Sequence, residues 1–257
     1  MIFNYLNTQE TVLFEHMSFD TAMRCIIVAV IAYLLGSINF GIIFTNIFAK
    51  KDIRSMGSGN AGATNVMRSV GTVPAILTFV CDFLKAVIAV LLGAYILSGV
   101  KAGTPETLLE YKIYGKYLAG LCVILGHMFP VFFKFKGGKG VVTTFATVIV
   151  IQWRVGLILL GIWLIVMLIT RYVSLASMIA AFCYGFVTFI FEYSIDYLSH
   201  ITDEAYLLTP RLILVSSFCA FAIGFLVIIK HYENIYRLTR HEEKKFTFKK
   251  NDSKYND

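Results

Sequence analysis

The chain has 257 residues, of which 58% are hydrophobic and only 15% are charged, and its formal net charge is +7. A soluble domain carries about 25% charged residues, so this composition excludes an ordinary soluble protein and indicates an integral membrane protein. The basic excess is typical of cytoplasmic loops between spans rather than of a surface that binds nucleic acid. The five cysteines occur singly, with no CxxC pair, which argues against a disulfide framework or a metal site.

Seven apolar segments are candidates for membrane-spanning helices, each of which needs about 20 apolar residues. The fourth and fifth are short and are separated only by Trp153 and Arg154, so they are either two short tilted helices or one broken re-entrant hairpin. The sequence predicts an all-α bundle of seven transmembrane helices in a single membrane-embedded domain, residues 1–257. In chain order the predicted spans are residues 25–46, 72–98, 113–133, 139–152, 155–170, 173–192 and 211–230.

Basic and acidic residues divide between the two ends of these spans. Basic residues gather in the loop 47–71, near 134–139 and in the tail 231–257, whereas acidic residues gather at the N-terminus and in 192–210. Because cytoplasmic loops are rich in lysine and arginine, we expect an external N-terminus and a cytoplasmic C-terminus. The tail lysines could also touch anionic lipid, although a solvated tail is the simpler interpretation.

A small, polar, glycine-rich segment stands between the first and second spans. Glycine permits positive φ, and successive backbone N–H groups can form an anion-binding nest. From Thr64 a helix could begin with Thr64, Asn65 and Arg68 on one face, and a helix N-terminus favours an anion. A flexible linker is the alternative, but linkers rarely combine these residues at helical spacing. The candidate phosphate-binding residues are Gly57, Ser58, Gly59, Asn60, Gly62, Thr64, Asn65 and Arg68.

Asp82 and Lys85 are three residues apart within the second span. Charged side chains in a span are unfavourable unless they are paired or face a cavity. The two residues therefore either form an ion pair that holds the bundle together or contact a polar substrate pocket.

A basic glycine loop, residues 136–140, follows the third span. Lys136, Gly137, Gly138, Lys139 and Gly140 offer backbone N–H groups and lysine charges to a phosphate. The loop lacks the GxxxxGK[ST] spacing, so nucleotide binding does not follow. A positive-inside turn would account for the lysines but not for the three glycines.

A polar motif follows the last span, where His231 and Asn234 are three residues apart and share a face if the helix continues. Taken by itself, His231 fits equally a histidine that hydrogen-bonds at the membrane interface.

These segments, in this order, resemble the bacterial acyl-phosphate:glycerol-3-phosphate acyltransferases, the PlsY-type family. The resemblance covers nearly the whole chain, with two departures at Asn39, where proline is common, and Ala86, where glycine is usual. The matching strings are GSINFG (36–41), DIRSMGSGNAGATNVMR (52–68), CDFLKA (81–86), GHMFPVFFKFKGGKG (126–140) and HYENIYRL (231–238).

The resemblance implies seven spans in the bacterial cytoplasmic (inner) membrane, with the active site at the cytoplasmic face. It implies acyl transfer from acyl phosphate to the 1-hydroxyl of glycerol 3-phosphate, giving lysophosphatidate and phosphate. Acyl phosphate, glycerol 3-phosphate and membrane lipid are the implied partners of a monomer, with no cofactor, metal or nucleic acid.

Carried over by motif, the resemblance gives catalytic roles to Ser58, Arg68, His231 and Asn234. It makes residues 136–140 the glycine loop for the substrate phosphate, with Lys139 as its charged member. Supporting or structural roles fall to residues inside the matching strings, namely Asp82, Lys85, His127 and Glu233.

The chemistry that these residues allow is direct transfer. Acyl phosphate is already activated, and the sequence shows no G-x-S-x-G elbow and no readable Ser–His–Asp set. We expect the segment 57–65 to hold the acyl phosphate head group, and Lys139, His231, Asn234 and Arg68 to hold glycerol 3-phosphate. Either His231 or an oxygen of the donor phosphate would accept the proton.

Two other membrane functions compete with this interpretation. A transporter of phosphorylated solutes would place its binding groups near the bilayer midplane, often in paired repeats, and we find no such repeat. A phosphotransferase of the CDP-alcohol type would need several metal-binding aspartates on one helix, whereas Asp82 stands nearly alone.

Overall fold

The protein is helical throughout the part that its computed structural model describes, residues 18–101, 103–198 and 208–246. A bilayer favours this, because a helix pairs its own backbone N–H and C=O groups and exposes few of them to lipid. The predicted all-α membrane architecture is confirmed. Six helical segments are long and apolar enough to span: Phe19–Ala49, Thr72–Ser98, Pro105–Phe133, Trp153–Thr170, Val173–Tyr197 and Pro210–Ile229.

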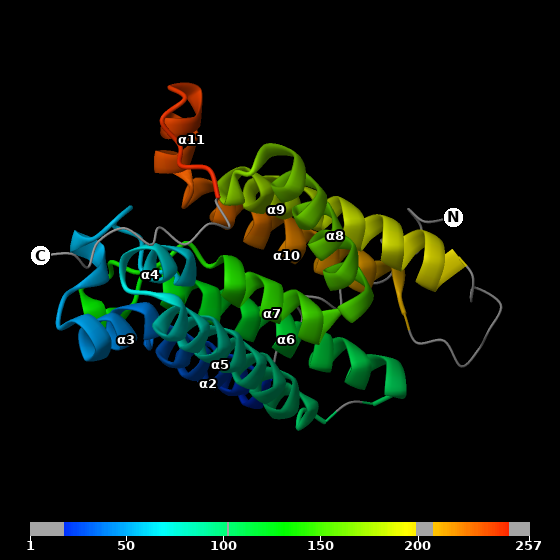
Figure 1. The fold of residues 1–257 in the computed structure, drawn as a ribbon. Helices are drawn as coiled ribbons and strands as arrows, with labels where there is room; N and C mark the ends of the chain where they lie inside the picture. The colour runs from blue at the N-terminus through cyan, green and yellow to red at the C-terminus, as the bar shows by residue number, and fades with distance from the viewer. Residues whose placement is uncertain (1–17, 102, 199–207, 247–257) are drawn as a thin grey trace, which may run out of the picture. The chain divides into compact units, whose positions relative to one another are not determined.

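The chain divides into two compact units, Met1–Gly138 and Lys139–Asp257, which we call the N-terminal and C-terminal units. The single domain expected from the sequence stays a prediction. In the N-terminal unit α2, α5 and α6 pack side by side (Figure 1). The elements of this unit are α2 (Phe19–Ser37), α3 (Phe40–Ala49), η1 (Ile53–Ser55), α4 (Ala63–Ser69), α5 (Thr72–Ser98), α6 (Pro105–Met128) and η2 (Val131–Phe133).

In the C-terminal unit α9 packs against both α8 and α10. The short helix α11 runs crosswise to α10 at its end (Figure 1). The elements of this unit are α7 (Val141–Ile151), α8 (Trp153–Thr170), α9 (Val173–Ile190), the π-helical η3 (Phe191–Tyr197), α10 (Pro210–Ile229) and α11 (Tyr232–Thr239).

The first predicted span is broken, and a continuous helix over 25–46 is therefore wrong. Helix α2 ends at Ser37 and α3 begins at Phe40. Asn39 has an extended backbone, and its Oδ1 accepts a hydrogen bond from the backbone N–H of Ile42 at 3.1 Å. An asparagine side chain that caps a new helix competes with continuation of the old one, so the break follows from Asn39.

Other span ends differ from the sequence prediction in ways that local chemistry explains. Helix α6 begins at Pro105 rather than at 113, because the Thr104 hydroxyl caps it and proline suits the first helical position. The sixth span continues past 192 as the π-helical segment to Tyr197. The predicted spans 72–98, 155–170 and 211–230 agree with α5, α8 and α10 within the usual uncertainty of helix ends.

The fourth and fifth predicted spans are two separate helices joined at Gln152. Helix α7 has only 11 residues, about 16 Å, roughly half of a bilayer core. Its flanks nevertheless reach both ends of the unit. Lys139 donates a hydrogen bond to Asn234 beyond the end of α10, and Gln152 lies 3.3 Å from Asp196 at the far end of α9.

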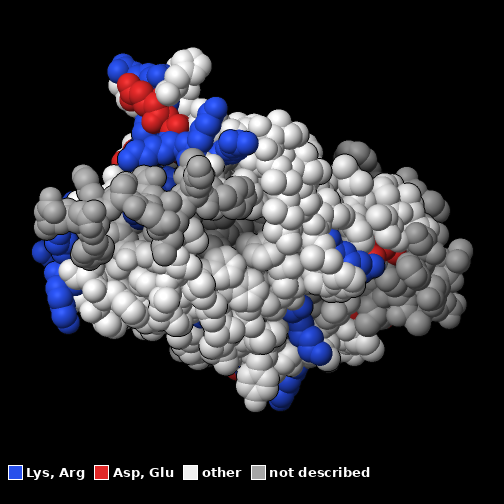
Figure 2. Space-filling model, in the orientation of Figure 1, with Lys and Arg blue, Asp and Glu red and all other residues white. Residues whose placement is uncertain are grey.

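Glycine lets the helices of the N-terminal unit approach closely. A Cβ on Gly93 of α5 would stand 2.3 Å from the carbonyl oxygen of Gly115 on α6, and one on Gly115 would stand 2.3 Å from that of Gly93. Small residues at such contacts are typical of helix association in membranes, where backbones pack closely. The outer faces carry large exposed apolar side chains and few charges along the helices (Figure 2).

We expect Gly115→Val to force α5 and α6 apart, because the added side chain meets the backbone of Gly93 rather than a movable side chain. The apparent melting temperature of the purified protein should fall by about 5 °C or more. Gly161→Val is the matched control, since a Cβ at this glycine of α8 has open space. Equal melting temperatures for the two variants would contradict the close packing.

Candidate active site

Asn65 folds the glycine-rich loop of the N-terminal unit around its own side chain. Only 2% of its surface is exposed. Its Nδ2 donates to the carbonyl oxygens of Met56 at 2.9 Å and Asn60 at 3.0 Å, and its Oδ1 accepts from the backbone N–H of Ser58 at 3.0 Å. The amide is therefore used by the loop backbone, and direct contact of Asn65 with a substrate stays a prediction.

The same loop exposes the two residues to which the sequence gave chemical roles. Gly57 and Gly59 have φ of +60° and +72°, values that favour glycine. A Cβ on Gly57 would also stand 2.2 Å from the Asn65 Oδ1. The resulting turn exposes Ser58, while α4 carries the exposed Arg68. The remaining predicted loop residues are half-buried: Asn60, Gly62 and Thr64.

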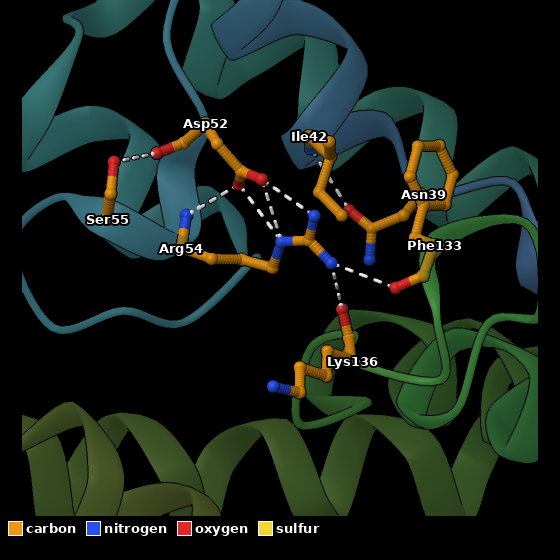
Figure 3. Close-up of polar contacts among 7 residues, drawn as sticks. All are labelled: Asn39, Ile42, Asp52, Arg54, Ser55, Phe133 and Lys136. Atoms are coloured by element: carbon orange, nitrogen blue, oxygen red, sulfur yellow. Dashed lines mark hydrogen bonds and ion pairs between the residues drawn. The ribbon is translucent and has the colours of Figure 1, made fainter.

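Arg54 ties the chain just before this loop to residues 133–136 of the same unit, where the basic glycine loop begins (Figure 3). Its Nε and Nη2 bind the Asp52 carboxylate at 2.6 to 3.0 Å, and its Nη1 donates to the carbonyl oxygens of Phe133 at 2.9 Å and Lys136 at 3.3 Å. The hydrogen bond to Arg54 lowers the pKa of Asp52. The planar guanidinium fork suits several acceptors at once, so Arg54 fixes two sequence-distant loops in one arrangement.

The basic glycine loop is fastened to the end of α6. The backbone N–H of Gly137 donates to the Met128 carbonyl at 3.3 Å, and that of Gly138 donates to the His127 carbonyl at 3.1 Å. A Cβ on Gly138 would stand 2.2 Å from the His127 Nε2. Both glycines are thus needed for this close contact. The N–H groups of Gly137 and Gly138 are therefore engaged by the end of α6.

Asp82, Lys85 and His127 form a buried polar group. The Lys85 ammonium lies 2.7 Å from the Asp82 Oδ1 and 3.2 Å from the His127 Nδ1. It also donates to the carbonyl oxygens of Gly36 at 3.0 Å and Ile38 at 2.6 Å, which the break between α2 and α3 leaves without helical partners. These contacts favour the ion-pair interpretation: the group closes the break in the first span.

His231 lies just before α11 in the C-terminal unit and is 3% exposed. Its Nδ1 is 2.7 Å from the Val227 carbonyl oxygen. A carbonyl can only accept, so Nδ1 carries the proton and Nε2 is the basic nitrogen of the neutral ring. Burial, together with the Lys139 charge, lowers the pKa of His231 to about 4, despite the opposing hydrogen bond to Val227. The ring is therefore neutral near pH 7.

Lys139 and Asn234 are in contact, as the family resemblance led us to expect of one substrate site. The Lys139 ammonium donates to the Asn234 Oδ1, and the Asn234 Nδ2 donates to Glu243 at 2.6 Å. Burial and the nearby Arg237 lower the pKa of Lys139 to about 8. Glu233 is exposed and lies 3.9 Å from Arg237, and its charge opposes this lowering of the Lys139 pKa.

The sequence patterns did not indicate two charged residues that hold the candidate site residues in place. In the N-terminal unit Arg54 was read only as a basic loop residue, although its position in the DIRSMGSGN string was visible. In the C-terminal unit Glu243 lies in the basic tail, which the sequence analysis interprets as solvated. No spacing rule would have found its contact with Asn234.

Comparisons with known proteins show the family of the chain. A family model described as glycerol-3-phosphate acyltransferase matches residues 26–241. The glycerol-3-phosphate acyltransferase of Francisella philomiragia is 41% identical over 227 residues, covering 87% of this chain and 95% of that protein. The glycerol-3-phosphate acyltransferase of Thermoanaerobacter sp. strain X514 is 39% identical over 223 residues, covering 87% and 96%.

Two crystal structures of PlsY, described as an integral membrane glycerol 3-phosphate acyltransferase, are similar to the chain at 37% identity. The glycerol 3-phosphate form superposes with a TM-score of 0.66 and covers 87% of this chain and 96% of that one. The lysophosphatidic acid form gives a TM-score of 0.63 with coverage of 87% and 95%.

Arg54→Lys should loosen the loop at residues 133–136. A lysine ammonium lacks the planar guanidinium that binds the Asp52 carboxylate and two backbone carbonyls at the same time. We expect amide hydrogen exchange in 133–138 to rise about tenfold. Arg68→Lys, in the same loop region but exposed, is the matched control and should leave it unchanged. Unchanged amide hydrogen exchange in Arg54→Lys would show that Arg54 does not hold this loop in place.

The burial of neutral His231 predicts a pH dependence of stability. Its folded pKa, about 4, lies below the ordinary 6.5, so between these values the unfolded chain binds more protons. The free energy of unfolding should therefore fall as the pH falls through this window, by about 2 kcal/mol between roughly pH 7 and pH 5.

Denaturant unfolding of wild type, His231→Gln and His241→Asn checks this expectation. The exposed His241 serves as the control, and its variant should retain the wild-type pH slope. His231→Gln should flatten that slope. A wild-type slope in His231→Gln would show that the imidazole titrates normally.

Proposed function

The chain belongs to the glycerol-3-phosphate acyltransferase family and is an enzyme of that activity, and from this premise we propose the details of its reaction. The acyl donor is acyl phosphate, and the acceptor oxygen is the 1-hydroxyl of glycerol 3-phosphate. The products are lysophosphatidate and inorganic phosphate. The observation that carries the proposal is the juxtaposition of a lysine, an asparagine and a neutral histidine in the C-terminal unit of a membrane enzyme of this family.

The acceptor subsite consists of Lys139, His231 and Asn234 of the C-terminal unit. Lys139, with a pKa of about 8, is largely protonated near pH 7 and supplies a positive charge for the phosphate. The Asn234 amide beside it adds hydrogen-bonding capacity. Positioning of the two reactants supplies much of the catalysis, because the donor is already activated.

The donor subsite is the loop 57–65. Its backbone is bent by Gly57 and Gly59 and held by Asn65, so that Ser58 is exposed toward a ligand. On this preformed loop the exposed Ser58 hydroxyl is suited to donate a hydrogen bond to the acyl phosphate head group. Ser58 acts as a hydrogen-bonding group in this scheme rather than as a nucleophile.

The transfer is direct. The 1-hydroxyl oxygen forms a bond to the acyl carbon, and the bond between that carbon and the phosphate oxygen breaks. The hydroxyl proton passes to the His231 Nε2 or to the departing phosphate. The protonation of His231 on Nδ1, fixed by the Val227 carbonyl, leaves Nε2 as the proton acceptor.

The membrane arrangement follows the distribution of charge. The proposed site residues of the C-terminal unit lie near the end of α10 that a basic tail follows, and this charge supports a cytoplasmic location for that end. We propose seven crossings with an external N-terminus, in which the short helix α7 and its flanking residues cross the membrane. The flanks of α7 reach both ends of its unit, which supports this crossing. A monomer that requires no metal or cofactor completes the proposal.

The test is a reaction of purified protein with palmitoyl phosphate and glycerol 3-phosphate, with a chelator present. Formation of lysophosphatidate and phosphate in equal amounts is expected. Activity with a thioester donor but not with palmitoyl phosphate would refute the proposed donor. Loss of activity with chelator alone would establish a metal, and movement of intact glycerol 3-phosphate across vesicles would favour the transporter alternative.

We expect His231→Gln to lower kcat by about 100-fold or more if Nε2 takes the proton, and the pH–rate profile to lose its acidic limb. The glutamine amide keeps hydrogen-bonding capacity but cannot accept a proton. Its control is His241→Asn, an exposed histidine on the tail, which should keep wild-type turnover. Near-normal kcat with only a raised KM in His231→Gln would assign the proton to the donor phosphate instead.

A further inference from the structure

The segment after α11 doubles back into the C-terminal unit. His241 adopts φ of +59°, and the backbone N–H of Glu242 donates to the Arg237 carbonyl at 2.8 Å. Farther on, the backbone N–H of Phe246 donates to the Arg171 carbonyl at 2.7 Å, in the turn between α8 and α9. Residues 240–246 are therefore a strap fixed at both ends, drawn in red beside α11 in Figure 1.

Glu243 is the residue that the strap carries inward. Its Oε1 accepts from the Asn234 Nδ2 and from the Ser174 hydroxyl, each at 2.6 Å, and its Oε2 accepts from the Arg237 Nε at 2.8 Å. The side chain is 10% exposed. Three side-chain donors thus bind one carboxylate. Removing a single group from such a network leaves its partners unpaired, which lowers the stability of the fold.

The Asn234 amide has one consistent orientation in this network. An ammonium only donates and a carboxylate only accepts. The amide oxygen must therefore face Lys139 and the amide nitrogen must face Glu243, as observed. Without the carboxylate, either end of the amide could turn toward the lysine or the substrate.

We infer that Glu243 is a positioning residue of the acyl-transfer reaction, which orients Asn234 and, through it, Lys139. The inference rests on the proposed acceptor subsite. Glu243 itself touches no reacting atom in this scheme. Through Glu243 alone, the C-terminal strap holds a residue of the proposed acceptor subsite in place.

If Glu243 acts on Lys139 through its negative charge, removing that charge should change the pKa of Lys139, which a purely structural role would not do. The charged groups facing Lys139 are Arg237 and Lys230, which lower its pKa, and Glu233 and Glu243, which raise it. Burial would raise the pKa of Glu243, but its hydrogen bonds from Ser174, Arg237 and Asn234 outweigh burial and lower it. Glu243 is therefore an anion near pH 7 and helps to keep Lys139 protonated.

The chain supplies a matched control in the adjacent residue. Glu242 has the same side chain and lies on the same strap, but it is exposed to solvent. Glu243→Gln removes the charge while keeping the shape, and Glu242→Gln makes the same chemical change one residue away. Ser174→Ala removes one donor from the carboxylate and leaves the Asn234 contact in place.

The experiment measures lysophosphatidate formation from palmitoyl phosphate and glycerol 3-phosphate as a function of pH for these variants. Glu243→Gln should raise the KM for glycerol 3-phosphate about tenfold, with a smaller change in the KM for palmitoyl phosphate. The alkaline limb of its pH profile should move to lower pH. Glu242→Gln should match wild type, and Ser174→Ala should fall between.

Acetic anhydride labelling of Lys139 against pH, followed by mass spectrometry, tests the same point without turnover. The apparent pKa of Lys139 should be lower in Glu243→Gln than in Glu242→Gln. This result would stand even if the proposed donor or acceptor were wrong. A lower melting temperature without either pH shift would reduce Glu243 to a structural residue, and a lower KM would show that it competes with the substrate phosphate.

Discussion

Every backbone group in a lipid-embedded chain needs a partner from the protein, and this constraint explains where the polar residues lie. The break at Ile38 and Asn39 releases carbonyls within the first span, and the Lys85 ammonium binds two of them while Asn39 caps the next helix. The Asp82 carboxylate then balances the buried charge, and the His127 Nδ1 lies beside the ammonium. Asp82 and Lys85, a candidate substrate contact by sequence, are therefore explained by the unfavourable free energy of unpaired backbone carbonyls in hydrocarbon.

Buried backbone groups in the loops that we assign to the substrates also need partners. The glycine-rich loop has no helix or strand to pair its backbone, so the Asn65 side chain does so from inside. The basic glycine loop is paired by the end of α6 and by Arg54. Both loops are therefore ordered before any ligand arrives. Such order reduces the entropy lost on binding, as a positioning mechanism requires.

In the C-terminal unit, order at the site depends on side chains rather than on backbone. Lys139, Asn234 and Glu243 form a chain of alternating donors and acceptors, and Arg237 and Ser174 complete it. Burial pulls the pKa values of Lys139 and His231 down, to about 8 and about 4. The result is a cation beside a neutral base, two different functions obtained from neighbouring basic residues by their surroundings.

The sequence by itself determined the membrane class, most of the spans and the glycine-rich strings that indicate the family. Apolar length, lysine and arginine bias and glycine-rich strings are local properties, readable in one segment at a time. The tertiary structure decided the break at Asn39, the use of Asn65 within its loop, and the places of Arg54 and Glu243. Arg54 meets Lys136 82 residues away, and Glu243 meets Ser174 69 residues away. Hydrogen bonds between such distant residues depend on how the helices pack, which no local pattern of residues records.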